Sequence, residues 1–417
     1  CYVVGALVSL CLGLKLRRLG SKIPQKLWYD RDNPKIKPAL ERINKLGKQR
    51  MNFDFSSEHR MIQEQVQRFL SDHSPLSVHR AVMEGEQLQA NSVWTGMAEM
   101  GLQGTAIPEA YGGVGAGYLP LCLIAQEIGA ALAPVPFSSS VYLASEAIGL
   151  YGSEAQKEDW LPKLASGELI GTFAVAEDLA EVTEATLSAS VQEGALNGSK
   201  LVVPHGLVAD IAVVLASSSE GPCLVVAPLD AVARKPVEII DPSLAAATLT
   251  FESTEVEMLG EPGQGWPQLE AVLHRAAVLF AFEQIGGASR ALDMAVAYAK
   301  DRFAFGRPIG SFQALKHMMA DMYVALKLAE SNAYYAAWAL ENNAPDLHLA
   351  AATARVSATQ ASQLCARDNI QVHGGMGFTW AYDCHLFYRR ANYLSVALGG
   401  LNRWEDRLIE ALPGAAA

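Results

Sequence analysis

A short segment between residues 302 and 313 carries the side chains best suited to binding chemistry. It combines arginines, aromatic rings and a glutamine around a turn that contains glycine and proline: Arg302, Phe303, Phe305, Arg307, Phe312 and Gln313. A plain connector seldom needs this mixture, although phenylalanines can anchor packing and arginines are often simply solvated. We therefore expect this segment to form part of a functional site.

Two long helices must hold this segment in place. Before it, small and apolar residues recur at intervals of three and four from Ala277 to Ala295, and the pattern resumes from Leu315 to Leu326. This spacing predicts amphipathic helices, and the short turn between them predicts an αα-hairpin. Gly286 and Gly287 would either leave room for a wide substrate or allow close helix packing, and we favour packing.

The segment belongs to a longer string, Asp301 to Ile309 followed by Phe312-Gln313, that resembles the acyl-CoA dehydrogenase family. A second string, Gln371 to Trp380, lies where this family repeats a Gly-Gly turn. Two motifs in the expected order make the resemblance specific, and it covers about Met51 to Leu412. The run from His385 to Arg390 is most similar to the bacterial branch that degrades steroids and other bulky acyl-CoAs.

The fold class implied by the resemblance is α+β with several domains, the acyl-CoA dehydrogenase fold. We expect an N-terminal all-α domain over residues 51–167, a middle β-barrel or sandwich over 168–264, and a C-terminal α domain like a four-helix bundle over 265–417. The sequence itself changes period at Glu168, where short β-branched runs begin, among them Val237–Ile240. Asn197-Gly198 predicts a tight turn between strands.

Residues 1–50 do not match the family. An apolar run from Cys1 to Leu14 is followed by Lys15, Arg17 and Arg18, a pattern that also occurs in membrane anchors and targeting segments. The run is shorter than the roughly 20 residues that a spanning helix needs. We favour an artefact of the gene boundary, because Met51 begins a sequence typical of the family's N-terminus, and we do not expect a membrane location.

The resemblance implies a dehydrogenation in which a carboxylate base removes the α-proton of a thioester while FAD accepts the β-hydride. In many members the base is a Glu in a loop after the Gly-Gly turn, and in others it lies near the start of the hairpin's first helix. The matching positions are Leu398 and Ala276, and neither can accept a proton. The nearest substitute is Glu283, which has apolar neighbours that would raise its pKa if it is buried. The alternative for Glu283 is a carboxylate hydrogen-bonded between helices.

The resemblance also implies which residues contact FAD. The family's C-terminal motifs reach across a dimer interface to the neighbouring subunit's FAD, and all the matching residues are kept: Arg302, Phe305, Gln313, Gln371, Gly374 and Gly375. In the middle domain, Ala176 and Asp178 stand for the Thr and Pro of the family's Thr-Glu-Pro, no Gly-Ser-Asp follows, and Val202 and Pro204 stand for the Trp and Thr of Trp-x-Thr. Carboxylates in that region would weaken the binding of an anionic cofactor. The groups for this chain's own flavin are therefore eroded.

We infer that the chain dehydrogenates an acyl-CoA as one subunit of a hetero-oligomer, whose homologous partner supplies the catalytic Glu. One alternative is a self-sufficient homo-oligomer that uses Glu283. Another is a non-catalytic structural or acyl-CoA-binding subunit on the same fold. By resemblance, the electron acceptor is an electron-transfer flavoprotein.

Composition limits the remaining possibilities. A length of 417 residues predicts two or three domains, and a net charge of −11 argues against a nucleic-acid partner. Six cysteines are scattered without a C-x-x-C pair. This usage fits a reduced cytoplasm and argues against a metal site or a disulfide framework.

Overall fold

The computed structural model describes residues 55–178 and 182–412. The predictions for residues 1–50 therefore lie outside the described residues. The chain divides into two units, and the fold described below is that of the unit from Phe55 to Leu408. Within the described ranges, no helix combines the length and the apolar character needed to cross a membrane.

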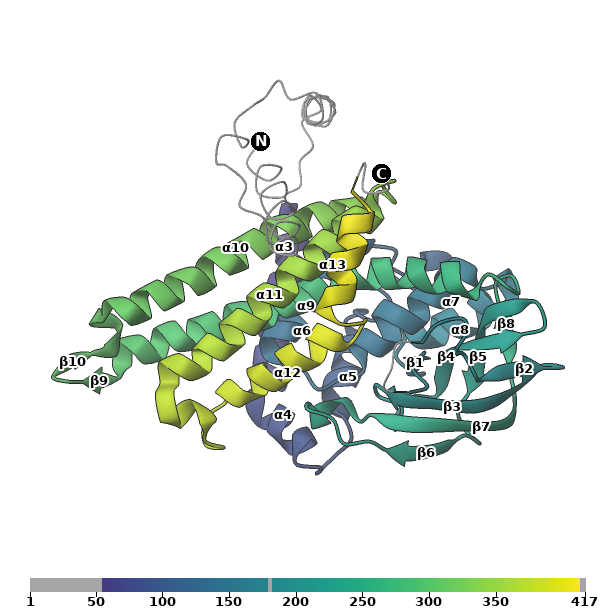
Figure 1. The fold of residues 1–417 in the computed structure, drawn as a ribbon, viewed down its shortest axis with the longest axis horizontal. Helices are drawn as coiled ribbons and strands as arrows, with labels where there is room; N and C mark the ends of the chain where they lie inside the picture. The colour runs from purple at the N-terminus through teal and green to yellow at the C-terminus, as the bar shows by residue number, and fades with distance from the viewer. Residues whose placement is uncertain (1–54, 179–181, 413–417) are drawn as a thin grey trace, which may run out of the picture. The chain divides into compact units, whose positions relative to one another are not determined.

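Helices form the N-terminal part of this unit, as predicted (Figure 1). The first helix is capped by Ser56, whose hydroxyl accepts the amide of His59, and it buries Val66 and Leu70 against the rest of the domain. The elements in order are α3 (Ser57–His73), α4 (Leu76–Met83), α5 (Asn91–Glu99), α6 (Tyr118–Ala131), the π-helix η3 (Ser138–Ser145), α7 (Glu146–Tyr151) and α8 (Glu154–Ala165).

The middle part is one sheet of eight strands with the order β6-β7-β3-β2-β4-β5-β8, and β1 pairs with β4 outside this path. No pairing joins β6 to β8 among the described residues, so the sheet does not close into the barrel that was one of the two expected forms. The strands are β1 (Gly171–Ala174), β2 (Ser190–Gln192), β3 (Ala195–Val203), β4 (Ile211–Ser218), β5 (Gly221–Pro228), β6 (Ala233–Pro236), β7 (Ala247–Glu255) and β8 (Glu257–Leu259).

The turn predicted at Asn197-Gly198 is wrong. These residues lie inside β3, at a bulge in its pairing with β7. The hairpin turn is at Glu193 and Gly194, where φ is 51° and 79°, as a two-residue hairpin turn requires. Gly198 is needed instead for close approach, because a Cβ there would lie 2.7 Å from the Cα of Ala189.

The strand predicted at Val237–Ile240 is also wrong. The strand in this region is β6, which ends at Pro236, and the chain then turns into the short 3-10 helix η4 (Pro242–Leu244). Asp241 begins this helix and accepts hydrogen bonds from the amide and hydroxyl of Ser243. The buried carboxylate of Asp241 thus draws the chain out of the sheet, which a β-branched run cannot reveal.

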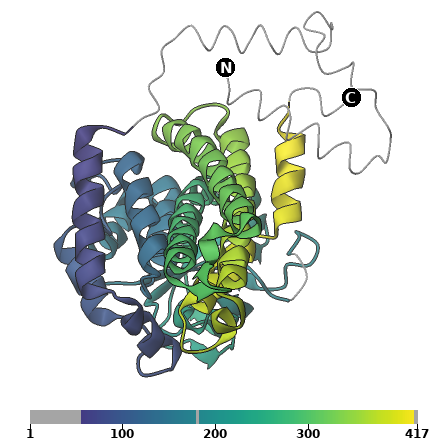
Figure 2. The same ribbon diagram turned by 90° about the vertical axis from the view of Figure 1, so that its left-hand side faces the viewer.

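Long helices form the C-terminal part, and Figure 2 views several of them nearly end-on. They are α9 (Gly265–Asp301), α10 (Gln313–Glu341), α11 (Leu347–His373), α12 (Cys384–Val396) and α13 (Leu401–Glu410). The predicted αα-hairpin is confirmed as α9 and α10, and α9 packs against α11 and α6. A Cβ at Gly286 would lie 1.8 Å from the carbonyl oxygen of Gln126 in α6, so the packing interpretation of this glycine is confirmed.

Candidate active site and cofactor surface

The segment between α9 and α10 is a small hairpin of β9 (Phe303–Ala304) and β10 (Arg307–Pro308). Its turn consists of Phe305 and Gly306, with φ of 53° and 77°. This left-handed backbone strains Phe305, whose side chain is 94% exposed. Arg302 at the base of the hairpin and Gln313 at the start of α10 are also exposed. The hairpin therefore presents a ring and an arginine to solvent.

The Gly-Gly turn lies directly after α11. Gly374 has φ 60° and ψ −140°, a conformation open essentially to glycine alone. A Cβ at Gly374 or Gly375 would meet no atom within 4 Å, so the backbone here is open to the close approach of a ligand. Gln371, in the last turn of α11, is exposed beside it.

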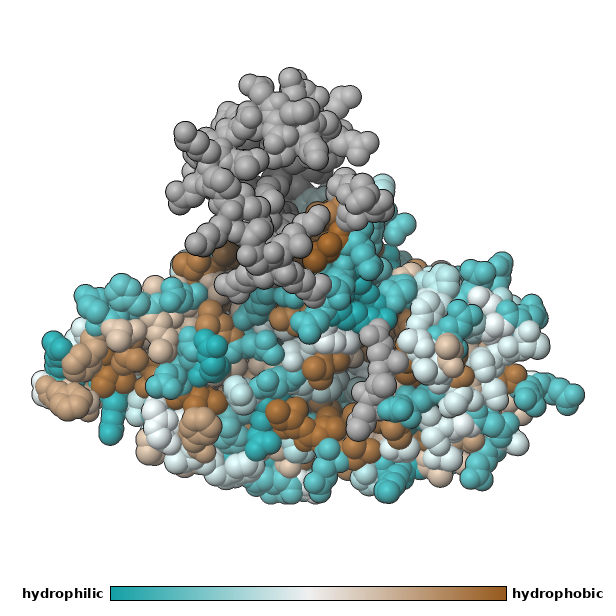
Figure 3. Space-filling model, viewed as in Figure 1, coloured by the Kyte–Doolittle hydropathy of each residue, from teal (hydrophilic) through white to brown (hydrophobic). Residues whose placement is uncertain are grey.

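These two loops lie at the same end of the helical bundle (Figure 1). The ring of Tyr298, in the last turn of α9, stacks on His373 at the end of α11 with centroids 4.1 Å apart. Apolar side chains gather at the hairpin end of the space-filling view (Figure 3). The structure leaves all the predicted cofactor positions exposed: Arg302, Phe305, Gln313, Gln371, Gly374 and Gly375.

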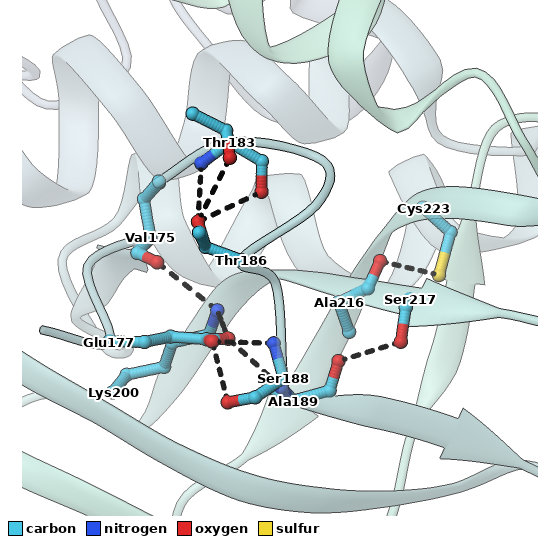
Figure 4. Close-up of polar contacts among 10 residues, drawn as sticks. All are labelled: Val175, Glu177, Thr183, Thr186, Ser188, Ala189, Lys200, Ala216, Ser217 and Cys223. Atoms are coloured by element: carbon cyan, nitrogen blue, oxygen red, sulfur yellow. Dashed lines mark hydrogen bonds and ion pairs between the residues drawn. The ribbon is translucent and has the colours of Figure 1, made fainter. Parts of the chain in front are cut away.

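In the middle domain, Glu177 is turned inward (Figure 4). Its carboxylate accepts the amide and hydroxyl of Ser188 at 2.6 and 2.7 Å, the amide of Ala189 at 3.0 Å and the ammonium of Lys200 at 2.6 Å. Lys200 is fully buried and also donates to the carbonyl of Val175 at 3.1 Å. Burial alone would raise the pKa of Glu177, but Lys200 and the Ser188 and Ala189 donors lower it. Glu177 therefore links the segment at Ser188 and Ala189 to Lys200 in β3. It is not the free charge facing a cofactor that its position in the sequence suggested.

Val202 and Pro204 lie where β3 bulges. Val202 has φ 50°, which is an outlier for a β-branched residue, and its side chain is 38% exposed. The carbonyl of Pro204 accepts the hydroxyl of Thr172 at 2.6 Å. The end of β3 therefore offers a small aliphatic group and a proline ring, without a hydroxyl or an aromatic face at the two matched positions.

Both positions of the usual base are held in the core. Ala276 is fully buried in α9, and Leu398 is 4% exposed. The carbonyl of Leu398 accepts the indole N–H of Trp404, a buried residue of α13, at 3.1 Å. Trp404 also packs edge-on against His274 in α9. These contacts fix the loop around Leu398 with an apolar side chain turned inward.

Glu283 belongs to a buried ion-pair network between α9, α12 and η4. Its Oε1 accepts Arg390 at 3.2 Å, and Arg390 also binds Asp241 at 2.5 Å and the hydroxyl of Ser243 at 3.0 Å. Burial raises the pKa of Glu283, and Arg390 opposes this shift. For Asp241, burial alone would raise the pKa, but Arg390 lowers it to about 2.

The space beside Glu283 is small. A cavity of about 10 Å³ is lined by Glu283, Gln284, Ser362 and Arg390 among others, which is room for roughly one water molecule. A thioester does not fit there. Glu283 makes the contact of a carboxylate bonded between helices, through its Oε1.

Sequence reasoning missed Lys200, Asp241 and Arg390, although each carries a buried contact. The signal that could have found them is a charged residue inside an apolar run. Such a residue is expected to be buried, and buried charges in proteins are paired. Asp383, just before α12, accepts a hydrogen bond from the guanidinium of Arg80 at 2.8 Å.

Two family models match the chain. The acyl-CoA dehydrogenase N-terminal domain matches residues 56–168, and the acyl-CoA dehydrogenase C-terminal domain matches residues 263–409. One relative, the acyl-CoA dehydrogenase IpdE2 of Mycobacterium tuberculosis, is 33% identical over 80% of this chain and 91% of its own length.

Solved structures agree. A variant of the Tcur3481-Tcur3483 steroid ACAD is 30% identical with a TM-score of 0.78, over 86% of this chain and 99% of that chain. The ChsE4-ChsE5 complex from Mycobacterium tuberculosis is 25% identical with a TM-score of 0.78, over 87% of this chain and 100% of that chain. Both the helix–sheet–helix order and the two motifs are thereby accounted for: this chain belongs to the acyl-CoA dehydrogenase family, whose members are FAD-dependent oxidoreductases acting on CH–CH bonds.

Proposed function

We propose that this chain is one subunit of a hetero-oligomeric acyl-CoA dehydrogenase, and that a homologous partner subunit supplies the catalytic Glu. The observation that carries the proposal is the contrast between Leu398 and Ala276, both buried and apolar, and the cofactor positions of the C-terminal domain, all exposed. A purely structural subunit would not need the cofactor-binding residue Arg302 or the Gly374 turn.

The reaction sets the requirements. The α-proton of a thioester is weakly acidic, so its removal needs a desolvated carboxylate and hydrogen bonds to the thioester oxygen. FAD, when bound, accepts the hydride from the β-carbon. Neither Leu398 nor Ala276 can take the proton, and Glu283 is engaged with Arg390. The proton acceptor therefore comes from another chain.

The C-terminal surface fits the phosphates of a flavin nucleotide. Arg302 is exposed and would bind a pyrophosphate through paired charge-assisted hydrogen bonds. The open backbone at Gly374 and Gly375 lets an anionic group approach closely. The exposed ring of Phe305 and the amides of Gln313 and Gln371 would complete the contacts.

The middle domain does not fit a flavin of its own in the same way. Val202 and Pro204 stand where an aromatic ring and a hydroxyl would be needed, and Ala176 and Asp178 stand where the family has Thr and Pro. The flavin that Arg302 serves is accordingly bound mainly by the partner's middle domain. The similarity to the ChsE4-ChsE5 complex supports an assembly of two different but homologous chains.

The substrate is an acyl-CoA, and the similarity to a steroid ACAD favours a bulky acyl group. An electron-transfer flavoprotein is the proposed acceptor of the electrons. No residue in the described part of the chain fixes the identity of the acyl group.

The test is the visible absorption spectrum of the purified chain, with and without a homologous subunit encoded beside it. We expect a colourless chain alone and a yellow complex that dehydrogenates acyl-CoA only when both subunits are present. Full flavin loading and turnover by this chain alone would refute the proposal. A mixed complex that forms but holds no flavin would favour the non-catalytic alternative.

A further inference from the structure

The loop that carries Gly374 and Gly375 is attached to a helix of another domain. This loop runs from Gly374 to Asp383, where α12 begins. Much of it faces solvent, and the side chains of Phe378 and Trp380 are 81% and 52% exposed. Apolar groups that exposed do not hold a loop in one position, so its anchoring must come from specific contacts.

Two polar contacts reach the loop from α4 of the N-terminal domain. The guanidinium of Arg80 binds the carboxylate of Asp383, with Nε at 2.8 Å and the second nitrogen at 2.7 Å. The indole N–H of Trp380 donates to the carboxylate of Glu84 at 3.0 Å. Arg80 and Glu84 are four residues apart, so they lie on the same face of the helix end and hold both sides of the loop's second half.

The contacts reinforce one another. The guanidinium of Arg80 also lies 5.7 Å from the ring of Trp380, within the range of a cation–π contact. The Trp380 ring is also stacked on His385 in α12, with centroids 4.8 Å apart. Trp380 is therefore held by contacts to α4 and to α12, although half of its surface faces solvent.

The helix that supplies these contacts is itself fixed. His79, the neighbour of Arg80, is buried, and its Nδ1 lies 2.8 Å from the carbonyl oxygen of Leu132. Val82 and Met83 are buried on the same helix. Because this helix is fixed, it can hold the loop in place through Arg80, whose side chain is only 20% exposed.

We propose that Arg80 and Glu84 are positioning residues for the Gly374–Gly375 turn, acting through Asp383 and Trp380. The N-terminal domain thereby sets the place of the backbone that receives the flavin phosphates. The part of this inference that concerns flavin rests on the proposed function. The part that concerns the position of the loop does not, and it can be measured in the chain alone.

The first experiment is hydrogen–deuterium exchange of the full chain, with the Arg80→Ala variant compared with the wild type. We expect exchange of the peptide covering residues 371–383 to rise about threefold to tenfold, as the loss of a partly buried ion pair allows. The charge-swapped double variant, Arg80→Asp with Asp383→Arg, should restore part of the protection. Lys163→Ala, which breaks a comparable ion pair with Asp159 in α8, should leave this peptide unchanged.

The second experiment is flavin release from the complex with the partner subunit. Arg80→Ala and Glu84→Ala should each accelerate release by about threefold to tenfold, while Glu84→Gln, which keeps an acceptor for Trp380, should release flavin at close to the wild-type rate. Unchanged exchange and unchanged release in Arg80→Ala would overturn the inference and leave the proposed function standing. A wild-type complex without flavin would refute the proposed function, and the exchange measurement would still decide the positioning role.

Discussion

The middle domain and the end of the helical bundle correspond to the two halves of the proposed flavin site, and their side chains are arranged in opposite ways. In the middle domain the acidic side chain at the matched position is buried in an ion pair with Lys200, and the neighbouring positions are Val202 and Pro204. At the end of the bundle, Arg302 and the Gly374 turn remain exposed and sterically open. Under the proposed function, the half-site that faces its own chain is filled with structural contacts, whereas the half-site that serves a neighbour stays open.

The Glu177–Lys200 ion pair and the strained turn at Phe305 have opposite effects on stability. Lys200 and Glu177 stabilise the chain whether or not a flavin is present, because the buried charges satisfy each other. The strained turn at Phe305 does the reverse, since it costs stability and leaves an aromatic ring in water. The Phe305 ring meets the ring of Phe312 edge-on, with centroids 6.2 Å apart, and most of its surface still faces solvent. Strain kept at so exposed a ring is consistent with a contact outside the chain.

The largest expected effect is on stability, in the middle domain. Lys200→Ala leaves the buried carboxylate of Glu177 without its cation, so the free energy of unfolding should fall by about 3 kcal/mol. Urea unfolding followed by circular dichroism measures this. The exposed lysine on β6, in Lys235→Ala, is the control and should change it by less than about 0.5 kcal/mol. If Lys200 were instead a flavin contact, its loss would release flavin from the complex with little change in unfolding.

The next effect is on the flavin, at the end of the bundle. Arg302→Ala should weaken flavin retention by the complex about tenfold to a hundredfold, because a charge-assisted contact to phosphate is lost. Its matched control is Arg307→Ala, on the same hairpin, where the guanidinium lies over the ring of Phe312. Fluorescence of released flavin gives both values. Equal losses in the two variants would mean that the hairpin contributes only general positive charge.

Acid should act on the middle domain. His205 is buried against Ser139, and burial lowers its pKa to about 3, with Arg390 adding to the shift. The unfolded chain protonates this histidine below about pH 6.5 while the folded chain does not, so stability falls as pH falls below that value, by about 2 kcal/mol at pH 5.

The check is urea unfolding at pH 7 and pH 5, with His205→Asn as the comparison. Asparagine tolerates the positive φ of 56° at this position and has no titrating group. In this variant, the loss of unfolding free energy between pH 7 and pH 5 should be smaller by about 2 kcal/mol. An unchanged pH dependence would place the responsible group elsewhere, for example at His274, whose pKa burial lowers to about 4.

The smallest expected effect is that of Glu283→Gln. Under the proposed function this variant should change turnover by the complex by less than about twofold, because its amide oxygen can still accept Arg390. A loss of a hundredfold or more would instead identify Glu283 as the base of a self-sufficient enzyme. Steady-state dehydrogenation of acyl-CoA distinguishes the two outcomes.

Local periodicity was a good guide to the helices and a poor one to the sheet. The hairpin of α9 and α10 followed from apolar spacing, since helix contacts repeat along one chain segment. The turn predicted at Asn197-Gly198 was wrong, because the glycine is required by the close approach of Ala189, just before β2. The same limit hid Lys200 and Arg390, whose partners lie far away in sequence.

By itself, the sequence determined the family, the order of helical and β segments, and the absence of a carboxylate at Leu398 and Ala276, because motifs and periods are local properties. Tertiary structure decided the rest. It placed Glu283 against Arg390, buried Leu398 beneath Trp404, turned Glu177 towards Lys200, and tied the Gly374 loop to Arg80. The physical reason is that the state of a charge depends on its burial and on its nearest partner, and both are set only when distant segments pack together.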